Sequence, residues 1–209
     1  METEAILDEL SKYRGYFPRK AVEEAIRQQT SITPHLLRAL EDAATYTHPP
    51  GETEPPFLPL YAIHLLAQFR ERRAYPLIAN LCRAPGTVVE DLLGDTVTEG
   101  LPRILATVFA DDMASIQSIV ENEAGNEWVR GAAVHALGIL VRWGIAKRTD
   151  VIDYFGELFR GRLERKSTHV WNDLAMECAD LHAATLAGDL RGAFDEGLID
   201  PGCIRLADR

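Results

Sequence analysis

Ionisable side chains recur at equivalent positions in several helix-forming stretches of this sequence. His64, Glu99 and His135 occupy one such position in three stretches, and Cys178 occupies it in a fourth. Histidine and carboxylate groups are common metal ligands, and a cysteine thiolate can be a nucleophile. This row of residues therefore raises two chemical hypotheses, a metal site and a catalytic cysteine.

Both hypotheses are weak on physical grounds. Packed helices lie ~8–10 Å apart, so histidines two layers apart are separated by roughly 20 Å, whereas zinc ligands lie ~2.0–2.2 Å from the ion. Cys82, Cys178 and Cys203 are widely separated and form no Cys-x-x-Cys pair. We expect structural thiols, no metal and no cofactor.

Two other roles remain open for the polar row. The side chains could hydrogen-bond across adjacent layers in a half-buried seam, or they could line a groove that binds a partner. In the groove, Asp95 and Glu99 would bind a basic side chain, and the histidines would make the rim sensitive to pH. The residues predicted to line this groove are His64, Gln68, Asp95, Glu99, Arg103, His135 and Arg142.

The composition restricts the class of partner. The chain has 209 residues, of which 46% are hydrophobic and 26% charged, as is typical of a globular protein. Its formal net charge of −10 repels nucleic acids and anionic membranes, so we expect a protein or peptide partner with a basic segment. The sequence has no signal-peptide pattern and no apolar run of ~18 residues, which favours a cytoplasmic location.

The elements that must position these residues are predicted to be helices throughout, because no alternating strand pattern is present. In "SITPHLLRALEDA" we expect Thr33 to be the N-cap and Pro34 to occupy the first turn. The proline-rich segment 45–59 cannot be a helix interior, so we expect a surface loop or a lid within one domain spanning residues 1–209.

The helical stretches also repeat. Ala62, Val97, Ala133 and Met176 align at spacings within the roughly 34–47 residues of two-helix repeats. The stretch "NEWVRGAAVHALGIL" is typical of the second helix of a HEAT-type repeat, in which small residues let adjacent layers approach closely. We therefore expect Gly138 to lie at a close contact with a neighbouring helix, and Trp128, Trp143 and Trp171 to be packing anchors.

The chain resembles an uncharacterised bacterial HEAT-like family, the domain of unknown function 1186. The resemblance spans nearly the whole sequence, and its most specific part is the central block "EDLLGDTVTEGL". The other segments that carry it are "YFPRKAVEEAI", "YAIHLLAQFRERRAYPLIANL", "NEWVRGAAVHAL" and "FDEGLIDPGCI". It implies an all-α fold, a HEAT-like α-α superhelix built as a short solenoid of antiparallel helix pairs, with no assigned activity.

The function expected from the sequence is non-catalytic binding of a protein or peptide in a polar concave groove. The alternative is an enzyme of a HEAT-like class, either a lyase or isomerase of a small molecule or a DNA glycosylase. A glycosylase needs a basic face for the DNA backbone, which the acidic composition opposes. The sequence contains no Gly-rich phosphate loop and no HExxH motif.

Overall fold

The computed structural model describes residues 1–47 and 55–205, and every regular element in these residues is a helix. The all-α prediction is therefore confirmed. None of the described helices is long and apolar enough to span a membrane. The helices are α1 (Thr3–Leu10), α2 (Arg19–Arg27), α3 (Gln29–Ala43), α4 (Leu58–Gln68), α5 (Ala74–Leu81), α6 (Val88–Leu93), α7 (Thr96–Glu99), α8 (Leu101–Val108), α9 (Met113–Val120), α10 (Glu127–Arg142), α11 (Arg148–Glu157), α12 (His169–Asp180) and α13 (Ala187–Asp195), with a π-helical turn at Leu158–Arg162 and a 3₁₀ turn at Ala184–Leu186.

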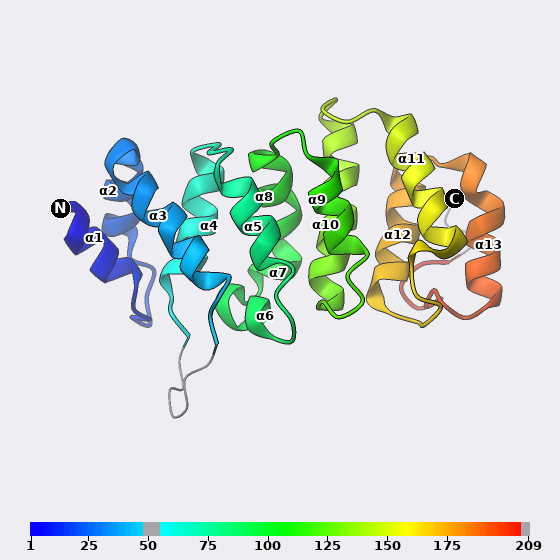
Figure 1. Ribbon diagram of the computed structural model, residues 1–209, viewed down its shortest axis with the longest axis horizontal. Coiled ribbons are helices and arrows are strands. Elements are labelled where there is room, and N and C mark those ends of the chain that lie inside the picture. Colours follow the sequence, from blue (N-terminus) through cyan, green and yellow to red (C-terminus); the bar gives the residue numbers. More distant parts are fainter. Residues whose placement is uncertain (48–54, 206–209) are drawn as a thin grey trace.

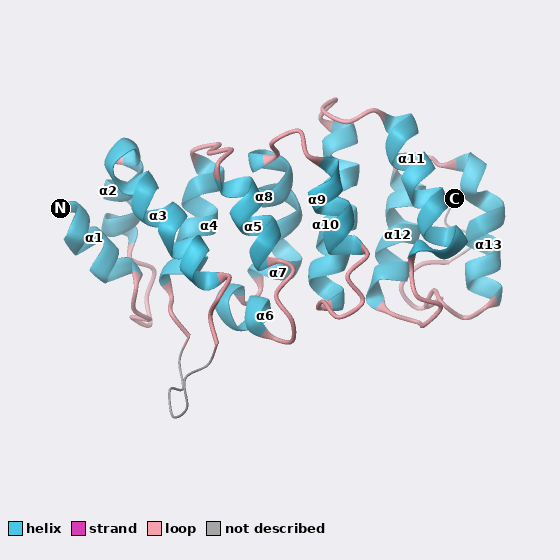
Figure 2. Cartoon of the chain, in the orientation of Figure 1, coloured by secondary structure: helices cyan, strands magenta, loops and turns pink. Residues whose placement is uncertain are grey.

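The helices are stacked in chain order from one end of an elongated molecule to the other (Figure 1). Loops join them at the two long edges (Figure 2). In one layer α4 packs on α8, α8 on α10 and α10 on α12, while α3, α5 and α9 follow one another in the other layer. Each layer buries its apolar stripe against the other, so the core is continuous along the row.

Two short helices interrupt this alternation between α5 and α8. Gly94 separates α6 from α7 and has φ +51°, a conformation that favours glycine because a side chain would be strained there. Gly100 then separates α7 from α8. As a result α6 contacts α4, and α7 contacts both α8 and α10. The central block of the sequence therefore forms two short helices in place of one long helix.

One buried ion pair ties three parts of the core together. The Arg130 side chain is 2% exposed, and its guanidinium donates to both carboxylate oxygens of Glu164 at 2.6 and 2.7 Å. Arg130 Nε also donates to the carbonyl of Val120 at 2.9 Å. The end of α9, the start of α10 and the segment before α12 are thus held by one side chain.

Part of the local prediction for α3 is wrong. The helix begins at Gln29, so Pro34 lies inside it, and the Thr33 hydroxyl donates to the Gln29 carbonyl at 2.7 Å instead of capping the helix. Pro34 has no backbone N–H, so the carbonyl of Thr30 lacks its usual hydrogen-bond donor in the helix. Thr30 is exposed, and water is therefore available to this carbonyl. Burial of Ile32 and other residues on the same stripe extends the helix past the proline.

The other local expectations have mixed outcomes. Trp171 is fully buried as expected, but Trp128 and Trp143 are 40% and 51% exposed, so those two are not core anchors. No helix is present between Ala43 and Leu58 in the described residues, in agreement with a proline-rich break. The hypothesis that segment 45–59 is a lid stays a prediction, because residues 48–54 of that segment lie outside the described residues.

We predict that Arg130→Ala lowers the free energy of unfolding by about 3–5 kcal/mol, because it removes a buried guanidinium and leaves both the partly buried Glu164 and the Val120 carbonyl without their donor. Arg162→Ala is the matched control, since Arg162 is 49% exposed where it pairs with Glu121, and exposed ion pairs contribute little. Urea denaturation measures both variants. Equal stabilities of the Arg130→Ala variant and the parent would contradict the assigned role.

Candidate functional site

Two pockets lie on either side of the short helix α7. The first, which we call the acidic pocket, has a volume of about 550 Å³ and is lined by Phe57, Leu60, His64, Asp91, Leu92, Leu93, Gly94, Asp95, Thr96, Glu99 and Gly100. The second, the histidine pocket, has a volume of about 200 Å³ and is lined by Val97, Thr98, Pro102, Trp128, Ala132, His135, His169 and Asp173. Because α7 borders both, its residues face different pockets according to their position on the helix.

The acidic pocket carries two carboxylates that are not neutralised. Asp95 and Glu99 are exposed, and neither side chain has an ion-pair or hydrogen-bond partner within the described part of the chain. His64 Nε2 lies 3.0 Å from Thr96 Oγ1. The pocket walls remove water from the imidazole and lower the pKa of His64, so this histidine is neutral at pH 7. The rim of the pocket is therefore negatively charged.

The acidic pocket also has apolar walls. Phe57 and Leu60 line it from the start of α4, and Leu92 and Leu93 line it from α6. A ligand with a cationic end and a hydrocarbon stem matches this combination, as lysine and arginine side chains do.

A second polar group, the α10–α12 cluster, consists of His135 and Arg142 from α10 with Asp173 and Glu177 from α12. His135 Nε2 lies 2.9 Å from Asp173 Oδ1, and His135 Nδ1 lies 2.7 Å from Glu177 Oε1. Arg142 donates to both oxygens of Glu177 at 2.8 and 3.2 Å. Asp173 and Glu177 are four residues apart on one face of α12, and both are buried.

Two glycines on α10 make room for these carboxylates. A Cβ atom on Gly131 would lie 1.7 Å from Asp173 Oδ2, and a Cβ atom on Gly138 would lie 1.7 Å from Glu177 Oε2. Gly138 thus lies at a close contact, as predicted. The neighbouring group is the carboxylate of Glu177, however, and not the backbone of a packed helix.

The cluster is internally charge-balanced. Burial opposes protonation of His135, but hydrogen bonds and charge from Asp173 and Glu177 outweigh burial and raise the pKa of His135 to about 9. The imidazole is therefore protonated at pH 7, with both nitrogens donating, and it has no lone pair to accept a proton. It holds α12 against α10 and is unsuited to the role of a general base.

The histidine pocket lies beside this cluster. His169 Nε2 is 3.4 Å from Asp173 Oδ1, and the His169 ring stacks on Trp128 with a centroid distance of 3.9 Å. Trp128 is 40% exposed and lines this pocket together with His169. The pocket is smaller than the acidic pocket, and its buried carboxylate already has partners.

The predicted groove residues fall into three groups. The acidic pocket brings together His64, Asp95 and Glu99, and the α10–α12 cluster contains His135 and Arg142. Gln68 and Arg103 are exposed and line neither pocket.

The structure places His135 beside Asp173 and Glu177 and not beside Glu99, which lines the acidic pocket on the other side of α7. Sequence reasoning missed both partner carboxylates. Their signal was a pair of acids four residues apart on α12, matched by glycines on α10.

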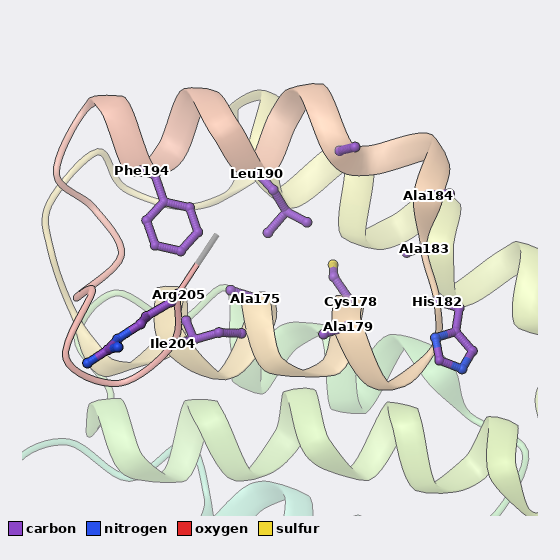
Figure 3. Close-up of a pocket in the computed structure, with 11 residues that line it drawn as sticks. Ala175, Cys178, Ala179, His182, Ala183, Ala184, Leu190, Phe194, Ile204 and Arg205 are labelled. Atoms are coloured by element: carbon purple, nitrogen blue, oxygen red, sulfur yellow. The ribbon is translucent and has the colours of Figure 1, made fainter. Parts of the chain in front are cut away.

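Cys178 lies on the other side of α12, one residue from Glu177. It faces Leu190 of α13 across an apolar pocket of about 290 Å³ (Figure 3). Burial raises the pKa of the Cys178 thiol to about 12, so the nucleophilic thiolate is absent at neutral pH. In the residues that the structure describes, no three histidine, cysteine or acidic side chains are grouped to hold a metal ion.

Comparison with known proteins places the chain in a family. The model of the family described as Protein of unknown function (DUF1186) matches residues 1–208. The chain belongs to this family. An uncharacterised protein of Chlamydia trachomatis is 39% identical over 208 residues, which cover 100% of this chain and 82% of that protein. An uncharacterised protein of Chlamydia muridarum is 38% identical over 208 residues and is covered to 83%. No solved structure matches the chain.

We predict that Gly138→Ala lowers the free energy of unfolding by about 1–3 kcal/mol, because the new methyl group displaces Glu177 from His135 and Arg142. This loss opposes the ~1 kcal/mol that alanine normally gains over glycine inside a helix. Gly192→Ala in α13 is the matched control, since a Cβ there meets nothing within 4 Å. Chemical denaturation should show the control unchanged or more stable, and a similar gain for Gly138→Ala would disprove the proposed contact.

We predict that the α10–α12 cluster makes stability depend on pH. The pKa of His135 is raised from 6.5 to about 9 on folding, so its contribution is present below pH 6.5 and is lost as the pH rises through 9. The free energy of unfolding should fall by about 1–3 kcal/mol across this range, and less in the His135→Gln variant. NMR titration of the His135 ring should give a midpoint near 9, whereas a midpoint at or below 6.5 would be inconsistent with the ion pairs.

Proposed function

We propose that this protein is a non-catalytic, HEAT-like module that binds a basic segment of a protein or peptide in the acidic pocket. The observation that carries the proposal is the pair of carboxylates at the two ends of α7, Asp95 directly before it and Glu99 as its last residue. Asp95 and Glu99 are exposed and line a pocket that also has apolar walls, without a cationic partner in the described residues. A lysine or arginine from a partner supplies both the charge and the hydrocarbon stem that this pocket fits.

The contrast with the α10–α12 cluster supports this assignment. There each buried carboxylate is neutralised by His135 or Arg142, so the cluster has no charge left to offer a ligand. The carboxylates at the ends of α7 face solvent, and the net charge of −10 extends an attractive field toward a basic partner. The same field opposes nucleic acids and anionic membranes as partners.

The state of the reactive side chains favours binding over catalysis. His135 uses both ring nitrogens in ion pairs, and burial raises the pKa of Cys82 and of Cys178 to about 12. Neither a base nor a thiolate nucleophile is available among these groups at neutral pH. These observations argue against the enzyme alternative at these residues.

The test is binding of fluorescein-labelled peptides measured by fluorescence anisotropy at low salt. We predict that a peptide of alternating lysine and alanine binds and that its glutamate counterpart does not. The double variant Asp95→Asn, Glu99→Gln keeps the side-chain shapes but removes both charges, and it should weaken binding of the lysine peptide by about tenfold or more. Salt should weaken binding to the parent protein more than binding to the variant.

The control carries the same charge change elsewhere. Glu123→Gln with Asp153→Asn removes two exposed charges outside the pocket, at the loop before α10 and on α11. This control should bind the lysine peptide as the parent does. An equal loss in the control would mean that only the net charge attracts the peptide, and the proposal would fail.

A further inference from the structure

Three aromatic rings adjoin the acidic pocket. Tyr13 comes from the loop after α1, Phe57 precedes α4, and Tyr61 lies in the first turn of α4. The ring centroids of Tyr13 and Phe57 are 5.5 Å apart, and those of Phe57 and Tyr61 are 5.8 Å apart. We call these three residues the aromatic cluster. Phe57 also lines the acidic pocket, so the two features form one continuous surface.

This surface exposes a large aromatic ring that the core does not use. Tyr13 is 66% exposed, and its ring contacts the cluster only through Phe57 among the ring pairs of the described residues. Exposed aromatic rings next to charged groups are typical of binding surfaces, because a ring buries a large area at a low cost in conformational entropy.

We propose that the acidic pocket and the aromatic cluster bind one extended segment that carries a basic residue and an aromatic residue. This inference rests on the proposed function and names the chemistry of its ligand. The basic side chain enters the pocket between Asp95 and Glu99, and the aromatic side chain packs on Tyr13 and Phe57. Charge complementarity selects the first residue, and ring stacking selects the second.

The residue shared by the two features suggests a short spacer between the basic and the aromatic residue of the partner. Phe57 lines the acidic pocket, and its ring centroid lies 5.5 Å from that of Tyr13. An extended chain advances roughly 3.3 Å per residue, so this ring-to-ring step corresponds to about two residues. We therefore test a peptide in which two serines separate the lysine from the phenylalanine.

The test uses three fluorescein-labelled peptides: GSKSSFSG, GSKSSSSG without the phenylalanine, and GSSSSFSG without the lysine. We expect GSKSSFSG to bind the parent protein about three- to tenfold more tightly than GSKSSSSG, as one aromatic contact provides. Tyr13→Ala should remove this gain while leaving the affinity for GSKSSSSG unchanged. That unchanged affinity also shows that the variant keeps an intact acidic pocket.

Trp143→Ala is the matched control, because Trp143 is an exposed aromatic residue at the end of α10, beside Ile145 in a separate pocket. It should retain the full gain from the phenylalanine. An equal gain for the parent and the Tyr13→Ala variant would overturn the inference and leave the proposed function standing. Binding of GSSSSFSG as tightly as GSKSSFSG would overturn both, since the lysine would then contribute nothing.

Discussion

Two carboxylates buried between α10 and α12 determine how the middle of the molecule is assembled. Burying a carboxylate is costly unless opposite charge and hydrogen bonds replace the lost water. Asp173 and Glu177 obtain both from His135, and Glu177 also obtains them from Arg142. These contacts are directional, so they fix the rotation and the register of α12 against α10 in a way that apolar packing alone does not.

The glycines of α10 belong to the same constraint. Gly131 and Gly138 lack the atoms that would occupy the positions of the carboxylate oxygens, so the small residues of this helix serve a polar interface. Helix α10 also packs against α7, α8 and α9. A fixed α10 therefore positions α7, whose two sides border the acidic pocket and the histidine pocket. The polar interface and the candidate binding site are linked through one central helix.

The distribution of charge follows from this arrangement. His135 and Arg142 already form ion pairs with the buried carboxylates, so they do not neutralise Asp95 or Glu99. Asp95 precedes and Glu99 ends the four-residue helix α7, which contains no basic residue, and their neighbour His64 is uncharged at pH 7. The acidic pocket thus retains its negative charge next to the exposed ring of Tyr13.

The sequence by itself determined the helical class and the break at the proline-rich segment, because these depend on local propensity. The repeat spacing, which aligns His64 with Glu99, indicated the grouping of His64, Asp95 and Glu99. Only the tertiary structure decided that His135 pairs with Asp173 and Glu177 and that Tyr13 meets Phe57. Helix periodicity defines a face but not the rotation of one helix against the next, and a shift of one residue exchanges Glu177 for Cys178. The chain changes direction at Gly94 and Gly100 by angles that depend on how α7 packs between its neighbours. Local sequence patterns do not determine these angles, so they did not predict the contacts across the two glycines.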